Sequence, residues 1–177
     1  MKKLLLFTLL FISATVFAQT EKNKVFLSGS TNASYLFSSI ESSDNKTTNI
    51  KISPSIGYFT RNNLILGISG LYENAKVSNK YYESKSTSFG LSPFLRFYTP
   101  NENRNNKLFL QIEGGYMESN NISGSFISGS FGLSFFLNQH VSFDIEGVYA
   151  HTVIENITIN SIGLDLGISV YLGNAKD

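Results

Sequence analysis

The 177-residue sequence contains no cysteine, no tryptophan and only three prolines. Without cysteine the chain forms no disulfide and cannot be lipidated in the manner of a lipoprotein. Only two histidines are present, and they form no cluster with the spacing of a metal site. These absences exclude a disulfide-stapled domain and a lipoprotein, and they lead us to expect no metal and no other cofactor.

A strong charge of either sign is also absent. The chain has 14 Lys+Arg against 13 Asp+Glu, for a net charge of +1, so nothing suggests nucleic acid as a partner. No proline-rich stretch or block of charge divides the chain, and its length fits one domain. Beyond residue 18 no apolar run approaches the roughly 20 residues of a membrane-spanning helix. If the protein enters a membrane, it must do so as a closed β-barrel.

The first eighteen residues are organised like a secretory signal peptide. Two lysines are followed by the apolar run Leu4–Ile12, and Ala18 ends a small-residue cleavage site. We expect residues 1–18 to be removed on export and residues 19–177 to form the mature barrel domain. An N-terminal membrane anchor is the alternative, but the apolar run is short for a span.

Two patterns of period two interleave along the rest of the chain. The first, apolar-Xaa-Ile-Xaa-Gly-Xaa-Tyr, begins at Leu66, Leu110 and Phe143, and the second, apolar-Gly-Leu-polar-Xaa-Xaa-apolar, begins at Phe89, Phe131 and Ile162. Such alternation predicts strands with one large apolar face and one face of Gly, Ser and a few charges. A soluble surface would be rich in Lys and Glu instead. The apolar face is therefore predicted to face lipid.

Counting alternate positions predicts eight strands and an all-β fold, an eight-stranded antiparallel up-and-down transmembrane β-barrel, present as a monomer. Small inward residues suit the narrow lumen of such a barrel. The alternative is a soluble secreted barrel or sandwich with its apolar stripe inward. The expected strands are Val25–Phe37, Thr48–Phe59, Leu64–Asn74, Thr87–Tyr98, Leu108–Glu118, Ser125–Leu137, Val141–Ala150 and Asn160–Leu172.

The polar connections are expected to alternate in length. Short turns are predicted at Arg61–Asn63, Pro100–Asn106 and Asn138–His140. Longer loops are predicted at Ser38–Thr47, Ala75–Ser86, Ser119–Gly124 and His151–Ile159. This alternation is typical of periplasmic turns and extracellular loops, and it puts both chain ends on the periplasmic side.

Charged residues occur at several positions of the predicted inner face. Because a charge in a narrow lumen needs a partner, we expect a central network in which two cations neutralise some of the carboxylates. A polar plug is favoured over an ion pathway, since eight strands leave no open channel. The predicted members are Lys51, Glu73, Arg96, Glu113, Asp144, Glu146 and Asp165.

Aromatic residues end the apolar stripes at matching positions. Tyr72, Tyr116 and Tyr149 close the three copies of the first pattern, and Tyr58 and Phe97 lie toward the opposite ends of their strands. We interpret these residues as two aromatic girdles at the membrane interfaces.

The combined pattern resembles the small outer-membrane β-barrel proteins of Gram-negative bacteria, such as the OmpA transmembrane domain and OmpX. The resemblance covers the whole mature chain. It implies an outer-membrane location, contact with outer-membrane lipid and lipopolysaccharide, and folding by the barrel-assembly machinery. The segment Asp165–Leu172 resembles the β-signal of this family, except that Leu172 occupies the last hydrophobic position and no terminal aromatic residue follows.

The expected function is a non-enzymatic structural or surface-interaction role. Tyr81 and Tyr82 lie among charged residues in Ala75–Ser86, a segment that could contact a host molecule, a partner protein or lipopolysaccharide phosphates. The alternatives are a narrow pore and, less favoured, a lipid A-modifying enzyme. Neither His140 nor His151 belongs to a recognisable nucleophile signature.

Overall fold

The structure is a computed structural model that describes residues 20–40, 43–78, 83–100, 105–120, 122–155 and 157–173. Side chains are described throughout these ranges except at 32–40, 43–48, 77, 78 and 157. The predicted signal peptide and the tyrosine pair Tyr81 and Tyr82 lie outside the described residues.

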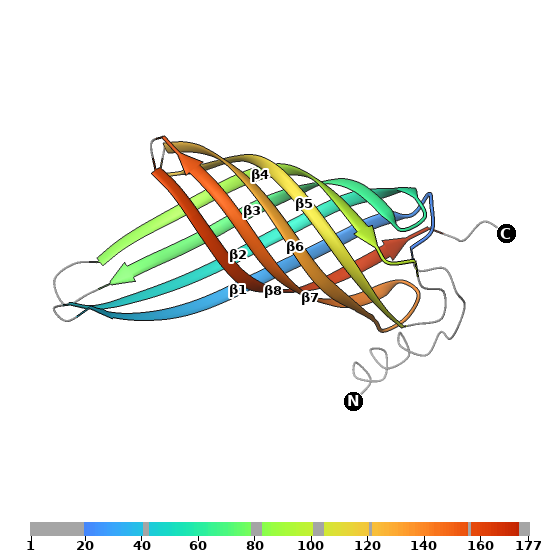
Figure 1. The fold of residues 1–177 in the computed structure, drawn as a ribbon, viewed down its shortest axis with the longest axis horizontal. Coiled ribbons are helices and arrows are strands. Elements are labelled where there is room, and N and C mark those ends of the chain that lie inside the picture. Colours follow the sequence, from blue (N-terminus) through green and yellow to red (C-terminus); the bar gives the residue numbers. More distant parts are fainter. Residues whose placement is uncertain are drawn as a thin grey trace, which may run out of the picture.

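Eight strands pair antiparallel with their sequence neighbours, and the last pairs with the first to close a barrel (Figure 1). This arrangement confirms the predicted up-and-down barrel. The described part of the chain contains no helix long and apolar enough to cross a membrane. The strands are β1 (Val25–Ile40), β2 (Ser43–Arg61), β3 (Leu64–Ser78), β4 (Glu83–Tyr98), β5 (Asn106–Ser119), β6 (Ile122–Phe136), β7 (Val141–Ile154) and β8 (Ile157–Leu172).

The strands are staggered around the barrel. If the cross-strand partners are followed from Val141 of β7 through every strand of the barrel, the path returns to β7 at His151. The offset is ten residues. A stagger of this kind requires the strands to tilt against the barrel axis. The tilt lets side chains of strands that are not neighbours, such as β4 and β7, meet across the lumen.

The outer wall is apolar and the inner wall is mostly polar. Alternate residues of each strand point outward, and their large apolar side chains are widely exposed, as at Leu91, Leu110 and Phe131. The buried inward set includes Ser92, Ser128 and many further polar residues. The apolar stripes therefore face outward as predicted, and the alternative of a barrel or sandwich whose apolar stripe faces inward is wrong.

The prediction of long loops at one end is wrong. We call the end where β1 begins and β8 ends the near end, and the opposite end the far end. At the far end the strands continue through most of the predicted loop residues, and only two to four residues separate consecutive strands. The longest link, between Tyr98 and Asn106, is at the near end. The four strands β1–β4 project farther at the far end than β5–β8 (Figure 1).

The physical reason for this error is the loss of the hydrophobic pattern beyond the apolar band. A strand that leaves a bilayer no longer needs an apolar face, so both of its faces can be polar. Such a segment resembles a loop in sequence, although its backbone is still paired with the neighbouring strand. Segments such as Ser43–Thr47 and Glu83–Ser86 are examples, because they are polar in sequence and paired in the structure. Pairing between neighbouring strands is a tertiary property that period-two counting does not detect.

The links at the near end position the strands closely. Two residues, Asn62 and Asn63, join β2 to β3, and Asn63 has a φ of 65°. Asparagine tolerates this left-handed conformation better than most residues, which explains its place in a tight hairpin turn. Two inward glycines make room for aromatic rings, since a Cβ on Gly67 or Gly132 would lie 2.6 Å or less from the ring of Phe94 or Phe109.

Candidate functional site

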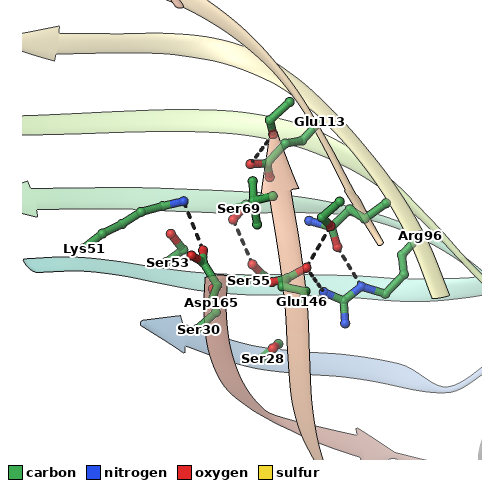
Figure 2. Close-up of a pocket in the computed structure, with 14 residues that line it drawn as sticks. Ser28, Ser30, Lys51, Ser53, Ser55, Ser69, Arg96, Glu113, Glu146 and Asp165 are labelled. Atoms are coloured by element: carbon green, nitrogen blue, oxygen red, sulfur yellow. Dashed lines mark hydrogen bonds and ion pairs between the residues drawn. The ribbon is translucent and has the colours of Figure 1, made fainter. Parts of the chain in front are cut away.

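The lumen contains a narrow polar pocket to which all eight strands contribute (Figure 2). In this view Lys51 and Arg96 enter from opposite sides, and carboxylates lie between them. Seven serines keep the walls small and provide hydroxyl groups for hydrogen bonds. The lining residues are Ser28, Ser30, Lys51, Ser53, Ser55, Ser69, Arg96, Gln111, Glu113, Ser128, Ser130, Glu146, Val148 and Asp165.

Arg96 of β4 is the central cation and is only 4% exposed. Its Nη1 donates to Asp144 Oδ2 at 3.1 Å, and its Nη2 lies 3.8 Å from Glu146 Oε2. Its Nε donates to Gln111 Oε1 at 2.6 Å. Both carboxylates belong to β7, so this ion pair connects two strands that are not neighbours in the barrel.

The Arg96 guanidinium also contacts aromatic rings. Its central carbon lies 4.1 Å from the ring centroid of Phe109 and 5.1 Å from that of Phe26. Cation–π contacts of this kind strengthen when water is excluded. The planar guanidinium therefore bonds to carboxylates at its edge and packs against aromatic rings, which a lysine ammonium group would do less well.

Asp144, 2% exposed, accepts hydrogen bonds from several sides. Ser142 Oγ donates to Oδ1 at 2.8 Å, and Ser169 Oγ donates to Oδ2 at 2.7 Å. Together with Arg96 these donors compensate the cost of burying a carboxylate. Glu146 is held similarly by Ser130, whose Oγ donates to Oε2 at 2.8 Å.

The second cation lies closer to the far end. Lys51 Nζ of β2 is 3.2 Å from Asp165 Oδ2 of β8, so this pair reaches across β1. About a quarter of the Lys51 side chain is exposed, which makes the pair less buried than that of Arg96. Each cation therefore joins a different pair of strands.

Two predicted members of the charge network are held by neutral partners. Glu113 Oε1 accepts a hydrogen bond from Ser128 Oγ at 3.0 Å. Glu73 Oε1 accepts one from Asn49 Nδ2 at 2.7 Å. The structure thus brings Arg96 to Asp144 and Glu146, and Lys51 to Asp165, while neutral side chains hold Glu113 and Glu73.

An aromatic floor, which the sequence patterns did not predict, closes the near end of the lumen. Tyr98 and Tyr171 share a hydrogen bond of 2.9 Å between their hydroxyl groups, and Tyr171 packs against Phe136 with ring centroids 5.1 Å apart. The expectation of a polar plug is therefore wrong for this end. The floor consists of Phe26, Phe59, Ile65, Phe94, Tyr98, Phe109, Phe136 and Tyr171.

The signal for this floor was present in the sequence. Its residues occupy positions of the polar face, and all except Phe94 lie near the near-end terminus of their strands. Period-two counting assigns them to the polar face, where they are exceptions to its polar composition. Apolar residues with inward parity that gather at one end of every strand except β7 indicate a closed end, and this pattern would have predicted them.

The chain just before β1 folds over the near mouth. Thr20 and Lys24 are buried, and Lys107 Nζ donates to Thr20 Oγ1 at 2.6 Å. The Asn63 amide donates to the Thr20 carbonyl at 2.7 Å, which ties this segment to the β2–β3 turn. Burial lowers the pKa of the Lys24 ammonium group, an effect that the nearby charge of Glu21 opposes.

Comparison with known proteins identifies the fold. No family model matches the chain, and no curated protein matches its sequence. The outer membrane protein OprG from Pseudomonas aeruginosa aligns with a TM-score of 0.58 at 10% identity, over 90% of this chain and 100% of that one. The N-terminal β-barrel domain of Pseudomonas aeruginosa OprF gives 0.53 at 10% identity, over 85% and 98%. Neisserial surface protein A gives 0.53 at 12% identity, over 83% and 96%.

The fold is that of the small outer-membrane β-barrels. Its outer wall carries the residues that the sequence analysis assigned to aromatic girdles. Tyr72, Tyr116 and Tyr149 lie on the outside toward the far end, and Tyr58 and Phe97 lie on the outside toward the near end. On the strands that carry these residues, most of the exposed apolar side chains lie between these two levels, while Ile50 and Val153 lie beyond the far one.

Neither histidine lies in the lumen. His140 is in the link between β6 and β7, where its carbonyl accepts from the Tyr171 amide at 2.8 Å. His151 Nδ1 lies 2.7 Å from Asn160 Oδ1, between β7 and β8. Among the residues that the structure describes, no group of three His, Asp or Glu side chains is arranged to hold a metal ion.

The Arg96 network makes a stability prediction. Arg96→Met should lower the free energy of unfolding by about 3–5 kcal/mol, because Asp144 and Glu146 would stay buried without their cation. Lys51→Met, the matched change at the more exposed pair, should cost less. Adding Asp144→Asn to Arg96→Met should restore part of the loss. Urea unfolding of the barrel in lipid measures all three, and equal losses for Arg96→Met and Lys51→Met would contradict the central role of Arg96.

Proposed function

We propose that the protein is an integral outer-membrane barrel, exported by a cleaved signal peptide, with a structural or surface-interaction role and no catalysis. One observation carries this proposal: the polarity of the barrel is inverted. Large apolar side chains are exposed over the outer wall, while charged residues such as Arg96 and Asp144 are buried inside. In water this arrangement would expose a continuous apolar surface far larger than monomeric soluble proteins tolerate.

The length of the apolar band supports a bilayer location. On β3 the band runs from Leu64 to Tyr72, eight residue steps of about 3.3 Å each. With a strand tilt of about 35–45° its height is about 20 Å, close to the roughly 25 Å band of outer-membrane barrels. The backbone pairing of a closed barrel satisfies the polar groups that would otherwise face hydrocarbon.

The side chains inside the lumen favour a filled barrel over a pore. The aromatic floor seals the near end, and Arg96 fills the space directly beside Phe26 and Phe109. An ion that entered from the far end would meet an apolar barrier. The narrow-pore alternative is therefore the weaker one, and the lipid A-modifying enzyme has no support from the positions of His140 and His151.

The far end supports a surface-interaction role. The strands β1–β4 extend beyond β5–β8 (Figure 1), so part of this sheet would stand outside the bilayer if the near end is periplasmic. By sequence, Tyr81 and Tyr82 lie between β3 and β4, two of the strands that project. An extracellular partner would meet these projecting strands first.

Assembly of the barrel offers one further partner. The segment that resembles a β-signal lies in β8, and its residues Leu166–Leu172 pair with Val25–Thr31 of β1. It is therefore part of the seam that closes the barrel. We propose that the barrel-assembly machinery recognises this strand before β1 takes its place.

The membrane proposal predicts heat-dependent gel mobility. Protein from a washed outer-membrane fraction should migrate faster when unboiled than when boiled, and the faster band should resist protease, because a closed barrel keeps its paired backbone in detergent. A soluble periplasmic protein without a mobility shift is the outcome that contradicts the proposal.

The filled lumen predicts that the barrel does not conduct ions. Purified barrel inserted into planar bilayers should give no steady conductance, because the aromatic floor blocks the near end. Successful insertion must be checked in the same experiment by gel mobility of the recovered protein. A steady single-channel conductance from the folded barrel would favour the pore alternative.

The surface-interaction role predicts loss of binding without loss of folding. Tyr81→Ser with Tyr82→Ser should reduce adhesion of expressing cells to the partner surface, while gel mobility stays unchanged. The matched control is Tyr58→Ser, a tyrosine at the near end that should leave adhesion intact. Equal adhesion of all three cell lines would leave only the structural role.

A further inference from the structure

The outer wall of β3 and β4 changes from apolar to polar just beyond its last aromatic residues. Tyr72 and Phe89 are cross-strand partners with ring centroids 5.3 Å apart, and they end the apolar band on these strands. The next outward pair is polar, since Asn74 Nδ2 donates to Thr87 Oγ1 at 3.2 Å. The wall is therefore polar from this level toward the far end.

The following outward pair consists of two lysines, Lys76 and Lys85, directly opposite each other in the register. Like charges at opposed positions destabilise a strand pair. Glu83 reduces the repulsion, since its Oε2 lies 2.9 Å from Lys76 Nζ and its Oε1 lies 3.2 Å from Lys85 Nζ. The two ammonium groups thus contact the same carboxylate, each at a different oxygen.

The height of this lysine pair matches that of lipid headgroups. Lys76 lies four residues beyond Tyr72, about 13 Å along the strand, or about 10 Å above the aromatic ring after a tilt of about 35–45°. Aromatic girdles mark the boundary between hydrocarbon and headgroups. A lysine can bend its flexible stem back toward that boundary, and both lysines are partly exposed.

At the far rim, the described residues of β5–β8 offer no comparable charge. Beyond Tyr116 and Tyr149, the outward positions of β5–β8 that the structure describes carry neutral or acidic side chains and a histidine, but no lysine or arginine. They include Glu118, Ser123, Ser125, His151 and Asn160. Among the described residues of the outer wall, the lysines at this rim therefore belong to the side formed by β1–β4.

We propose that Lys76 and Lys85 form a binding site for the phosphate group of an outer-leaflet lipid. The inference rests on the proposed outer-membrane location and assigns its lipid contact to one place on the wall. A phosphate monoester carries a charge of about −1.5 to −2 and several acceptor oxygens, so it binds both ammonium groups and competes with the single charge of Glu83. The Tyr72–Phe89 pair below packs against the acyl chains of the same lipid.

The test uses the folded full-length barrel in phosphatidylcholine nanodiscs that contain either bisphosphorylated lipid A or the same lipid A after phosphatase treatment. Native mass spectrometry measures the lipid A retained by the barrel. The wild type should retain the phosphorylated form in preference to the dephosphorylated form. Lys76→Gln with Lys85→Gln should weaken that retention about thirtyfold, from the loss of two ammonium groups near the membrane surface.

The control removes two exposed cations from the opposite rim, with Lys22→Gln and Arg61→Gln. This variant should retain phosphorylated lipid A as the wild type does. Equal retention of the two lipid A forms by the wild type, or equal losses in the two double variants, would overturn the inference. Heat-dependent gel mobility of the same samples reports on the barrel separately, so a folded barrel without phosphate preference overturns this inference alone.

Discussion

The buried Arg96 ion pair is the constraint on which the interior depends. A guanidinium that is 4% exposed needs anions and hydrogen-bond acceptors within reach, and Asp144, Glu146 and Gln111 supply them from β7 and β5. The cost of desolvating these charges is compensated only when the geometry is complete. Barrel closure, strand tilt and the small serine walls all serve that geometry.

The aromatic floor and the ion pair support each other. Phe26 and Phe109 exclude water from one side of the guanidinium, which strengthens its attraction to the carboxylates. In return, the charged network marks the level in the lumen at which the aromatic floor ends. The barrel thus has two kinds of interior, an apolar plug at the near end and a polar pocket above it.

Much of the architecture was predictable because period-two alternation is a local property. The number of strands, their direction and the outward face of residues such as Ile68, Leu91 and Ile112 follow from counting alternate positions. The far-end extensions of the strands were not predictable in this way. Polar segments such as Glu83–Ser86 pair with neighbours without an apolar face, so their sequence carries no hydrophobic pattern.

The sequence by itself determined an inverted barrel, because one side chain in two must face hydrocarbon and the other must fit a narrow lumen. It also identified the charged inward positions, Arg96 and Asp144 among them. Only the tertiary structure decided which charges meet, since strand register and tilt bring Arg96 of β4 to β7 and Lys51 of β2 to Asp165 of β8. These contacts join residues 48 and 114 positions apart, a separation at which no local pattern carries information.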